Sequence, residues 1–220
     1  VGRVAITAGP ITSAADSIEI TLHSPGGHTS RPHLTADLVY GMGTVITGLP
    51  GVLSRRIDPR HSTVMVWGAA NAGVAANAIP QTGTLAGTVR TASRESWLDM
   101  EFLVREAVSG LLAPLGIDHA LLYRRGVPPV VNEERSTQIM THAIEAVGPD
   151  VLADTRQSGG GEDFSWYLEE VPGAMARLGV WDQVGEQLDL HQPNFDIDER
   201  ALAVGVRVLV NTVEQSALLG

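Results

Sequence analysis

The chain has 220 residues, 44% hydrophobic and 18% charged, a composition that supports a buried core and excludes wholesale disorder. Its net charge of −10 argues against nucleic acid as a partner, because phosphates select basic surfaces. Cysteine and lysine are absent, which excludes disulfides, thiolate nucleophiles and lysine Schiff bases. No apolar run reaches the ~18–20 residues of a membrane span, so we expect a cytoplasmic protein without membrane contact.

The first predicted strand covers residues 17–23, where apolar and polar side chains alternate. From Leu38 the apolar residues recur at helical spacing, and we expect Pro50-Gly51 to end that helix. Ser93 is expected to cap a second helix with an apolar stripe. The remaining strands of this part are predicted at residues 62–68, 84–89 and 120–123.

The resulting order over residues 13–125 is β-α-β-β-α-β, which predicts the ferredoxin-like arrangement. Four antiparallel strands would carry both helices on one face of the sheet. The other face must then be solvated or meet a partner, so we expect this part to form dimers.

A second part begins at the stiff connector Gly126-Val-Pro-Pro129. Asn132, followed by two glutamates, predicts the start of a helix that Gly148-Pro149 ends. A glycine-rich loop at residues 159–161 precedes a predicted short helix. The remaining predictions are a strand at 174–180 and a helix from 198 to about 213, apolar on nearly all sides and therefore buried.

A short predicted strand at residues 3–7 falls outside the ferredoxin-like pattern, and we assign it to the second part. The predicted domains are therefore residues 13–125, inserted into a discontinuous domain of residues 1–12 and 126–220. The fold class is α/β, of the α+β kind. Because Val1 rather than Met stands first, we expect the natural start to have been removed.

Two of the seven histidines lie in contexts that favour chemistry over an ordinary structural role. His28 follows Gly26-Gly27, whose flexible backbone would expose the ring so that it can donate a hydrogen bond to a developing oxyanion. His191 stands just before a predicted helix, where a neutral imidazole could bind a divalent metal. Neither residue belongs to a His-x-His or H-E-x-x-H pair, so local spacing alone assembles no metal site.

Arg90 ends a predicted strand, where its guanidinium could hold a substrate carboxylate with two hydrogen bonds; an ordinary surface ion pair is the alternative. The segment Gly159-Gly-Gly161 lacks the lysine of a phosphate-binding loop. With Glu162 and Asp163, this loop suits an amine or the ligand shell of a metal. A helix start with acids in its first turn explains it about equally well.

Six motifs occur in the order found in the M20 metallopeptidase family, and they make the chain resemble its amidohydrolases of N-acyl amino acids, hippurate and indole-acetyl amino acids. Residues 13–125 resemble the inserted lid, or dimerisation, domain, and the rest resembles an incomplete α/β catalytic domain. The motifs are Gly27-His-Thr-Ser-Arg-Pro-His33, Asn77-Ala-Ile-Pro80, Gly87-Thr-Val-Arg90, Pro128-Pro-Val-Val-Asn132, Gly160-Gly-Glu-Asp-Phe164 and Leu190-His-Gln-Pro-Asn-Phe-Asp196.

The resemblance implies a hydrolase in which water on one of two divalent ions, zinc or manganese, attacks the amide carbonyl. It assigns His28 to the oxyanion, in its own or the partner subunit's site, Asn77 to placing the substrate and Arg90 to the substrate carboxylate. It also matches His191 to the last metal ligand and Glu162 to a residue lining the site. The implied partners are an N-acyl amino acid and a second copy bound through the lid.

In this family the other metal ligands and the general-base glutamate lie upstream of the lid, in a segment that this sequence does not contain. One imidazole does not hold a catalytic zinc, which needs about three protein ligands. We therefore expect these residues alone to bind no metal stoichiometrically and to be inactive, as a fragment or a degenerate product. The alternatives are a non-catalytic dimerisation or small-ligand-binding module, and an ordinary domain whose histidines and arginines are structural.

Overall fold

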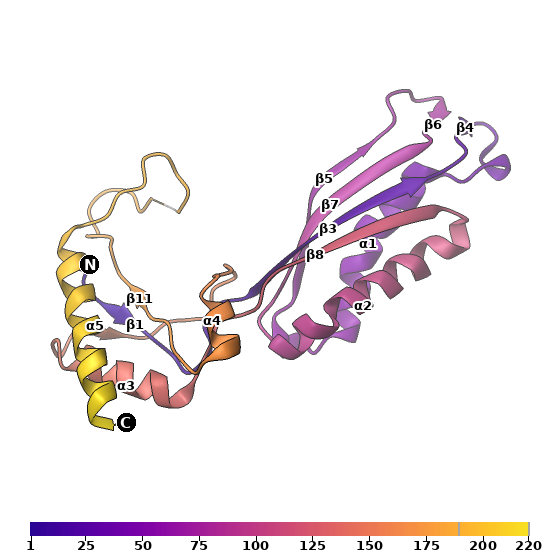
Figure 1. The fold of residues 1–220 in the computed structure, drawn as a ribbon. Coiled ribbons are helices and arrows are strands. Elements are labelled where there is room, and N and C mark those ends of the chain that lie inside the picture. The colour runs from indigo at the N-terminus through magenta and orange to yellow at the C-terminus, as the bar shows by residue number, and fades with distance from the viewer. Residues whose placement is uncertain (189, 220) are drawn as a thin grey trace. The chain divides into compact units, whose positions relative to one another are not determined.

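The structure, a computed structural model, describes residues 1–188 and 190–219 and divides the chain into two compact units (Figure 1). The sheet unit comprises Thr12–Pro129 and Gly159–Asp163. The terminal unit comprises Val1–Ile11, Val130–Ser158 and the described residues after 163. Each unit has its own hydrophobic core.

The sheet unit is built on four antiparallel strands in the order β5-β7-β3-β8, with two helices on one face (Figure 1). The predicted ferredoxin-like order is confirmed, and each strand is longer than predicted. The main elements are β3 (Ala14–His23), α1 (Leu38–Arg56), β5 (Val64–Ala72), β7 (Thr82–Thr91), α2 (Arg94–Leu112) and β8 (Asp118–Val127). The short ones are β4 (Gly27–His28), β6 (Ala78–Ile79) and the 3₁₀ helices η1 (Pro32–Leu34), η2 (Pro59–His61) and η3 (Ala113–Leu115).

Strand β3 shows why the helices cover only one face. Ile18, Ile20 and Leu22 are buried, whereas the residues between them are partly or fully exposed, as the two-residue period of a strand requires. Helix α2 is capped as predicted, since the Ser93 side chain accepts from the Ser96 N–H at 3.3 Å. The two helices close the core with the buried residues Met42, Val45, Leu49, Met100, Val104 and Val108.

Helix α1 continues through Pro50-Gly51, where the sequence predicts its end. A proline has no N–H to donate to the carbonyl four residues earlier, which here is that of Ile46. The indole Nε1–H of Trp67, on β5, donates to this carbonyl at 3.1 Å. The prediction was wrong because a donor from a neighbouring strand satisfies the group that the proline leaves unpaired.

The terminal unit consists of short strands and three helices. Strand β1 (Val4–Ala5) pairs parallel with β10 (Leu152–Ala153) and antiparallel with β11 (Arg177–Leu178), and β2 (Gly9–Pro10) pairs with β9 (Val131–Asn132). The helices are α3 (Glu134–Glu145), α4 (Ser165–Glu170) and α5 (Arg200–Leu219). No helix among the described residues is long and apolar enough to span a membrane.

Helix α3 begins with a different cap from the predicted one. The carboxylate of Glu133 accepts the backbone N–H groups of Arg135 and Ser136. A hydrogen bond with the Ser136 side chain, followed by these two backbone bonds, lowers the pKa of Glu133. Asn132 is instead buried, and its side chain bonds Met175 of the segment before β11. The cap prediction was therefore wrong by one residue, because a tertiary contact takes the asparagine.

The last helix also departs from the prediction. Helix α5 begins at Arg200 and is not buried on nearly all sides. The predicted strand at 174–180 is reduced to the two residues of β11, and α4 begins at Ser165. The large apolar side chains of α5 that are exposed in this structure are Leu202, Val206, Leu209, Val210, Val213 and Leu218.

Candidate functional site

His28 and Asn77 lie side by side at one end of the sheet unit. In the β4–β6 pair His28 stands opposite Ala78, and the N–H of Thr29 donates to the carbonyl of Asn77 at 3.3 Å. Figure 1 shows β4 and β6 beyond one end of β3 and β7. This is the end at which His23 pairs with Thr82. The structure thus places the backbone segments that carry two of the predicted site residues next to each other at this far end of the sheet.

The loop that follows β3 exposes His28. Gly26 has a φ of +71°, and a Cβ there would approach a side-chain carbon of Gln81 to 2.8 Å, so the turn requires glycine. Thr35 Oγ1 donates to the Gly26 carbonyl at 2.9 Å and ties the two sides of the loop together. His28 is exposed on this loop, which the Thr35 hydrogen bond holds together.

Ser30 determines which nitrogen of His28 can donate. The backbone N–H of Ser30 donates to Nδ1 of His28 at 3.1 Å, and its hydroxyl lies 2.8 Å from the same nitrogen. A ring nitrogen that accepts an N–H carries no proton, so the neutral ring is protonated on Nε2. The Nε2–H is then the donor that an oxyanion can use.

Arg90 lies at the opposite end of the sheet, near the end of β7, where it pairs with Ala15 of β3. Its Nη1 donates to the carbonyl of Gly159 at 2.8 Å, and the N–H of Ser13 donates to the carbonyl of Gly160 at 3.0 Å. These bonds hold the loop Gly159–Asp163 in the sheet unit. From the sequence we expect this loop in the second domain, because neither of these two hydrogen bonds can be recognised from a local sequence pattern.

Glu162 is carried by that loop, and its side chain is exposed. Arg90 is half-buried, and its bond to Gly159 uses one of the five N–H donors of a guanidinium. A carboxylate can still take two of the remaining donors in a planar fork. The structure therefore brings Arg90 and the Glu162 loop together in a second cluster. This cluster lies at the connector end of the sheet, the end next to the connector at residues 126–129.

The two clusters are far apart. From Thr82 to Arg90 strand β7 advances eight residues, or about 26 Å at ~3.3 Å per residue. An N-acyl amino acid has the length of about two extended residues, roughly 7 Å. One small substrate molecule therefore cannot touch His28 and Arg90 of the same chain.

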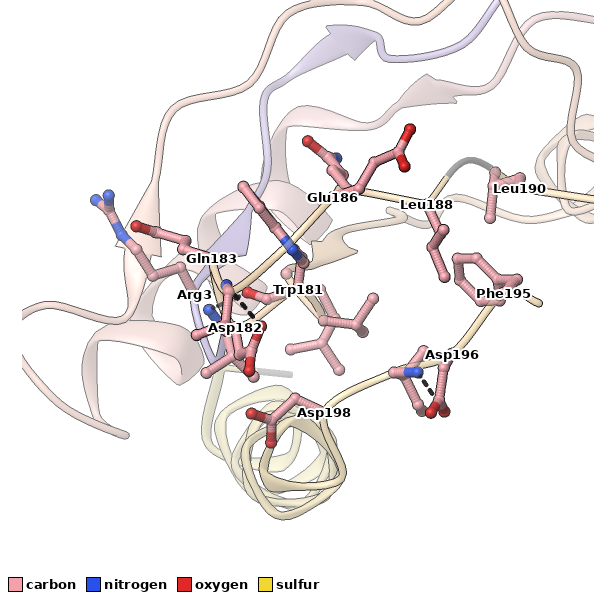
Figure 2. A pocket seen from close by; sticks show the side chains of 17 residues that line it. Arg3, Trp181, Asp182, Gln183, Glu186, Leu188, Leu190, Phe195, Asp196 and Asp198 are labelled. Carbon is pink, nitrogen blue, oxygen red and sulfur yellow. Dashed lines mark hydrogen bonds between the residues drawn. The ribbon is translucent and has the colours of Figure 1, made fainter. Parts of the chain in front are cut away.

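His191, the predicted metal ligand, belongs to the terminal unit. Its side chain is exposed and its backbone is left-handed, with a φ of +67°, a conformation that costs a residue with a Cβ free energy. The neighbouring segments form a pocket of about 800 Å³ that the sequence did not reveal (Figure 2). Its apolar lining residues include Trp181, Leu188 and Phe195.

Three aspartates also line this pocket, and each has a local partner. Asp182 and Asp196 accept the backbone N–H groups of Val184 and Ile197 at 2.9 and 2.8 Å. Asp198 forms an ion pair with Arg200, whose side chain lowers the pKa of Asp198 to about 2. Among residues 1–188 and 190–219, no three His, Asp or Glu side chains are placed to hold a metal ion.

A buried aspartate beside the connector end of the sheet was also missed. The Asp16 carboxylate accepts Trp97 Nε1–H at 3.0 Å, the Gly126 N–H at 2.8 Å and the Tyr123 hydroxyl at 2.5 Å. Burial, followed by the bond to Asp16, raises the pKa of Tyr123. The sequence could have indicated it, because Asp16 stands at a core-facing position of a strand with alternating burial. A carboxylate buried there needs hydrogen-bond partners that are buried as well.

Comparison with known proteins gives a match to peptidase family M20/M25/M40 over residues 10–215. A Rhodococcus jostii protein named "Putative glutamate--cysteine ligase 2-3" is 55% identical over 96% of this chain and 27% of its own length. The N-acetyl-L-cysteine deacetylase of Bacillus subtilis is 33% identical over 92% of this chain and 47% of its own. The chain spans about half the length of most of the curated relatives it matches.

Solved structures have the same fold. A protein described as an aminohydrolase of methicillin-resistant Staphylococcus aureus is 24% identical, with a TM-score of 0.87 over 98% of this chain and 55% of its own. The Bacillus subtilis YXEP protein, described as a dinuclear metal-binding peptidase, is also 24% identical, with a TM-score of 0.77 over 96% of this chain and 52% of its own.

Proposed function

This chain belongs to peptidase family M20/M25/M40, and we propose that it carries substrate-recognition groups of an amidohydrolase that cleaves N-acyl amino acids. Its relatives include deacetylases of N-acetylated amino acids. The observation that carries the proposal is the hydrogen bond from the Ser30 N–H to Nδ1 of His28, which leaves Nε2–H as a donor on an exposed loop.

In the proposed reaction, water adds to the amide carbonyl, the C–N bond breaks, and a carboxylic acid and a free amine result. His28 Nε2–H stabilises the negative charge that develops on the carbonyl oxygen. Asn77, beside His28, orients the acyl amide, and Arg90 holds the substrate carboxylate. Glu162 lines the site next to Arg90 from the same loop cluster.

A second copy of the chain completes the site in this proposal. The separation of about 26 Å along β7 supports it, since one small substrate cannot reach both clusters of one chain. In a homodimer, His28 and Asn77 of one subunit act on a substrate that Arg90 of the other subunit holds. Symmetry then gives two equivalent sites.

We propose N-acylcysteines as the substrate class. The Rhodococcus relative is named as a glutamate–cysteine ligase and the Bacillus relative as an N-acetyl-L-cysteine deacetylase, and both names contain cysteine. Hydrolysis of an N-acylcysteine releases the free cysteine that such a ligase would join to glutamate. The diaminopimelate derivative named in other relatives is the competing substrate.

The described residues do not fit a dinuclear metal centre by themselves. His191 is one imidazole, whereas each catalytic zinc needs about three protein ligands, and no carboxylate or histidine cluster accompanies it in the described part of the chain. The group that activates the water therefore lies outside these residues in our proposal. A non-catalytic module that keeps the scaffold is the second candidate, and the same observation favours it.

The test is hydrolysis by the full-length protein, with metal content measured by mass spectrometry. N-acetyl-L-cysteine, N-acetyldiaminopimelate and hippurate are compared as substrates by the amine released. We expect turnover of all three with the highest kcat/KM for N-acetyl-L-cysteine. A stable dimer that takes up no metal and releases no amine from any of them would support the non-catalytic module instead.

A further inference from the structure

Arg31 stands three residues after His28 on the same exposed loop. Its backbone N–H donates to the carbonyl of His28 at 2.9 Å. This bond closes a four-residue turn, in which the first and last Cα atoms lie less than about 7 Å apart. The side chains of His28 and Arg31 therefore start from neighbouring points of the backbone.

Hydrogen bonds on both sides of Arg31 hold this turn in one shape. The N–H of Ser30 donates to Nδ1 of His28 at 3.1 Å, and the N–H of Leu34 donates to the carbonyl of Arg31 at 3.1 Å. Pro32 disfavours helical backbone at the residue before it, and Arg31 has a φ of −131° and a ψ of +54°. The position of the Arg31 backbone relative to His28 is thus fixed by the loop.

The side chain of Arg31 has no partner within residues 1–188 and 190–219. It is exposed, and its guanidinium forms neither a hydrogen bond nor an ion pair there. By contrast, the guanidinium groups of Arg56 and Arg105 pair with glutamates. All five N–H donors of Arg31 are therefore available, and a carboxylate can take two of them in a planar fork.

The sequence around this loop is free of acidic side chains. Residues 20–36 contain no Asp or Glu, and neither do residues 59–94, which include β6, the partner of β4 (Figure 1). The neighbouring acids are Asp37, which caps α1, and Asp118, which stands opposite His23 at the start of β8. In a chain of net charge −10, the loop is thus a positively charged feature that favours an anionic group.

We propose that Arg31 binds a carboxylate at the end of the substrate's acyl group. The inference rests on the proposed function and deepens it, because it makes the acyl group that of a short dicarboxylic acid. If His28 holds the acyl oxygen, the acyl chain begins next to the turn that carries Arg31. In a succinyl group, two methylene groups separate the carbonyl from the carboxylate, about the length of one extended residue, ~3.5 Å.

The two carboxylates of such a substrate are then bound by different subunits. The acyl carboxylate belongs to the subunit that supplies His28, because Arg31 lies on the same loop. The carboxylate of the amino acid belongs to the subunit that supplies Arg90. Hydrolysis releases the dicarboxylic acid and free cysteine.

The experiment changes the charge of the acyl group while the amino acid stays the same. The full-length protein is given N-succinyl-L-cysteine, N-acetyl-L-cysteine and N-succinamoyl-L-cysteine, in which a neutral amide replaces the terminal carboxylate. The variants are Arg31→Ala and Arg31→Lys. Arg55→Ala is the matched control, since Arg55 is an exposed arginine in the last turn of α1 that bonds only the Ser54 hydroxyl.

We expect the wild-type protein and R55A to have a kcat/KM for the succinyl substrate on the order of tenfold above that for the succinamoyl substrate, the usual effect of a hydrogen bond between charged groups. In R31A this ratio should fall to about one, while the acetyl substrate is hydrolysed as before. R31K should lie between them, because an ammonium keeps the charge and loses the fork.

A wild-type protein that hydrolyses all three substrates without preferring the succinyl one would overturn the inference. An unchanged ratio in R31A would overturn it as well, and so would losses of equal size on all three substrates, which would leave Arg31 with a role in the loop only. If the wild-type protein released cysteine from none of them, the proposed function itself would be refuted.

Discussion

The guanidinium of Arg90 donates a hydrogen bond of 2.8 Å to the carbonyl of Gly159, 69 residues later in the chain. The N–H of Ser13 reinforces this link by donating to Gly160 at 3.0 Å. Both bonds bind a flexible glycine segment to the ends of sheet strands. The loop that bears Glu162 is therefore positioned by the residue that we assign to the substrate carboxylate.

Loss of the Arg90 side chain should loosen this loop. In Arg90→Ala, hydrogen exchange at the Ser13 amide should accelerate on the order of tenfold, because its acceptor lies in the loop. Arg124→Ala is the control, since Arg124 makes an exposed ion pair with Glu19 at 3.6 Å. Mass-spectrometric exchange on the purified chain measures both, and equal exchange in the two variants would contradict the tether.

Arg90→Ala should also separate two kinds of substrate. If Arg90 holds the carboxylate, KM in the full-length protein rises most for N-acylcysteine and far less for the corresponding carboxamide, which lacks the charge. Initial-rate kinetics on the matched pair give the result. Losses of the same size on both substrates would show that Arg90 holds the Gly159–Asp163 loop but does not bind the substrate carboxylate.

His28→Ala should lower kcat by on the order of 10²–10³, the effect of losing one oxyanion donor. Because the interaction forms in the transition state, KM should change little. His33→Ala is the matched control, since His33 is an exposed histidine in the same loop. A loss in H28A of less than about threefold would refute the assigned role.

The proposed second copy predicts complementation. H28A and R90A are each strongly impaired at low substrate concentration in this scheme, but a mixed dimer contains one site with both residues intact. Random mixing of the two should recover about a quarter of the wild-type activity. Subunits are exchanged by co-expression and the activity is compared with each variant alone. No recovery in verified mixed dimers would mean that His28 and Arg90 act without a second chain.

The buried Asp16–Tyr123 pair predicts a dependence of stability on alkaline pH. Because the folded state raises the pKa of Tyr123, its contribution is fully present below the unfolded value near ~10 and is lost as the pH rises above it. Tyr123→Phe should cost about 1–3 kcal/mol at pH 7, since it leaves the buried carboxylate one donor short. Urea unfolding followed by tryptophan fluorescence measures both effects.

In Y123F the decline in stability above pH 10 should be smaller than in the wild-type protein. Tyr167→Phe serves as the control, because Tyr167 is 68% exposed. A parallel decline in wild type and Y123F would show that another group controls the alkaline transition.

The sequence predicted the sheet unit well because its strands alternate with period two and each is long enough to show it. The strands of the terminal unit are two residues long, too short for any period, and β10 was missed entirely. The end of α1 was predicted wrongly because the acceptor freed by Pro50 is satisfied by Trp67, 17 residues farther along the chain. Such a partner follows from the tertiary fold and not from helix propensity.

For the candidate site, the motifs identified His28, Asn77, Arg90, Glu162 and His191 as individual residues. Their grouping depends on topology. The pairing of β4 with β6 joins His28 to Asn77, and the length of β7 separates both from Arg90. The pocket at Trp181 has no local sequence pattern, because it is formed by segments distant in the sequence.

The Gly159–Asp163 loop also limits how this protein can be rearranged. Since both flanks of the loop belong to the terminal unit, the chain passes between the units four times instead of the two required for a simple insertion. A graft of residues 12–129 onto another scaffold would leave behind the acceptor of Arg90 and the segment that carries Glu162. Any modular exchange of the sheet unit must therefore transplant two stretches of sequence together.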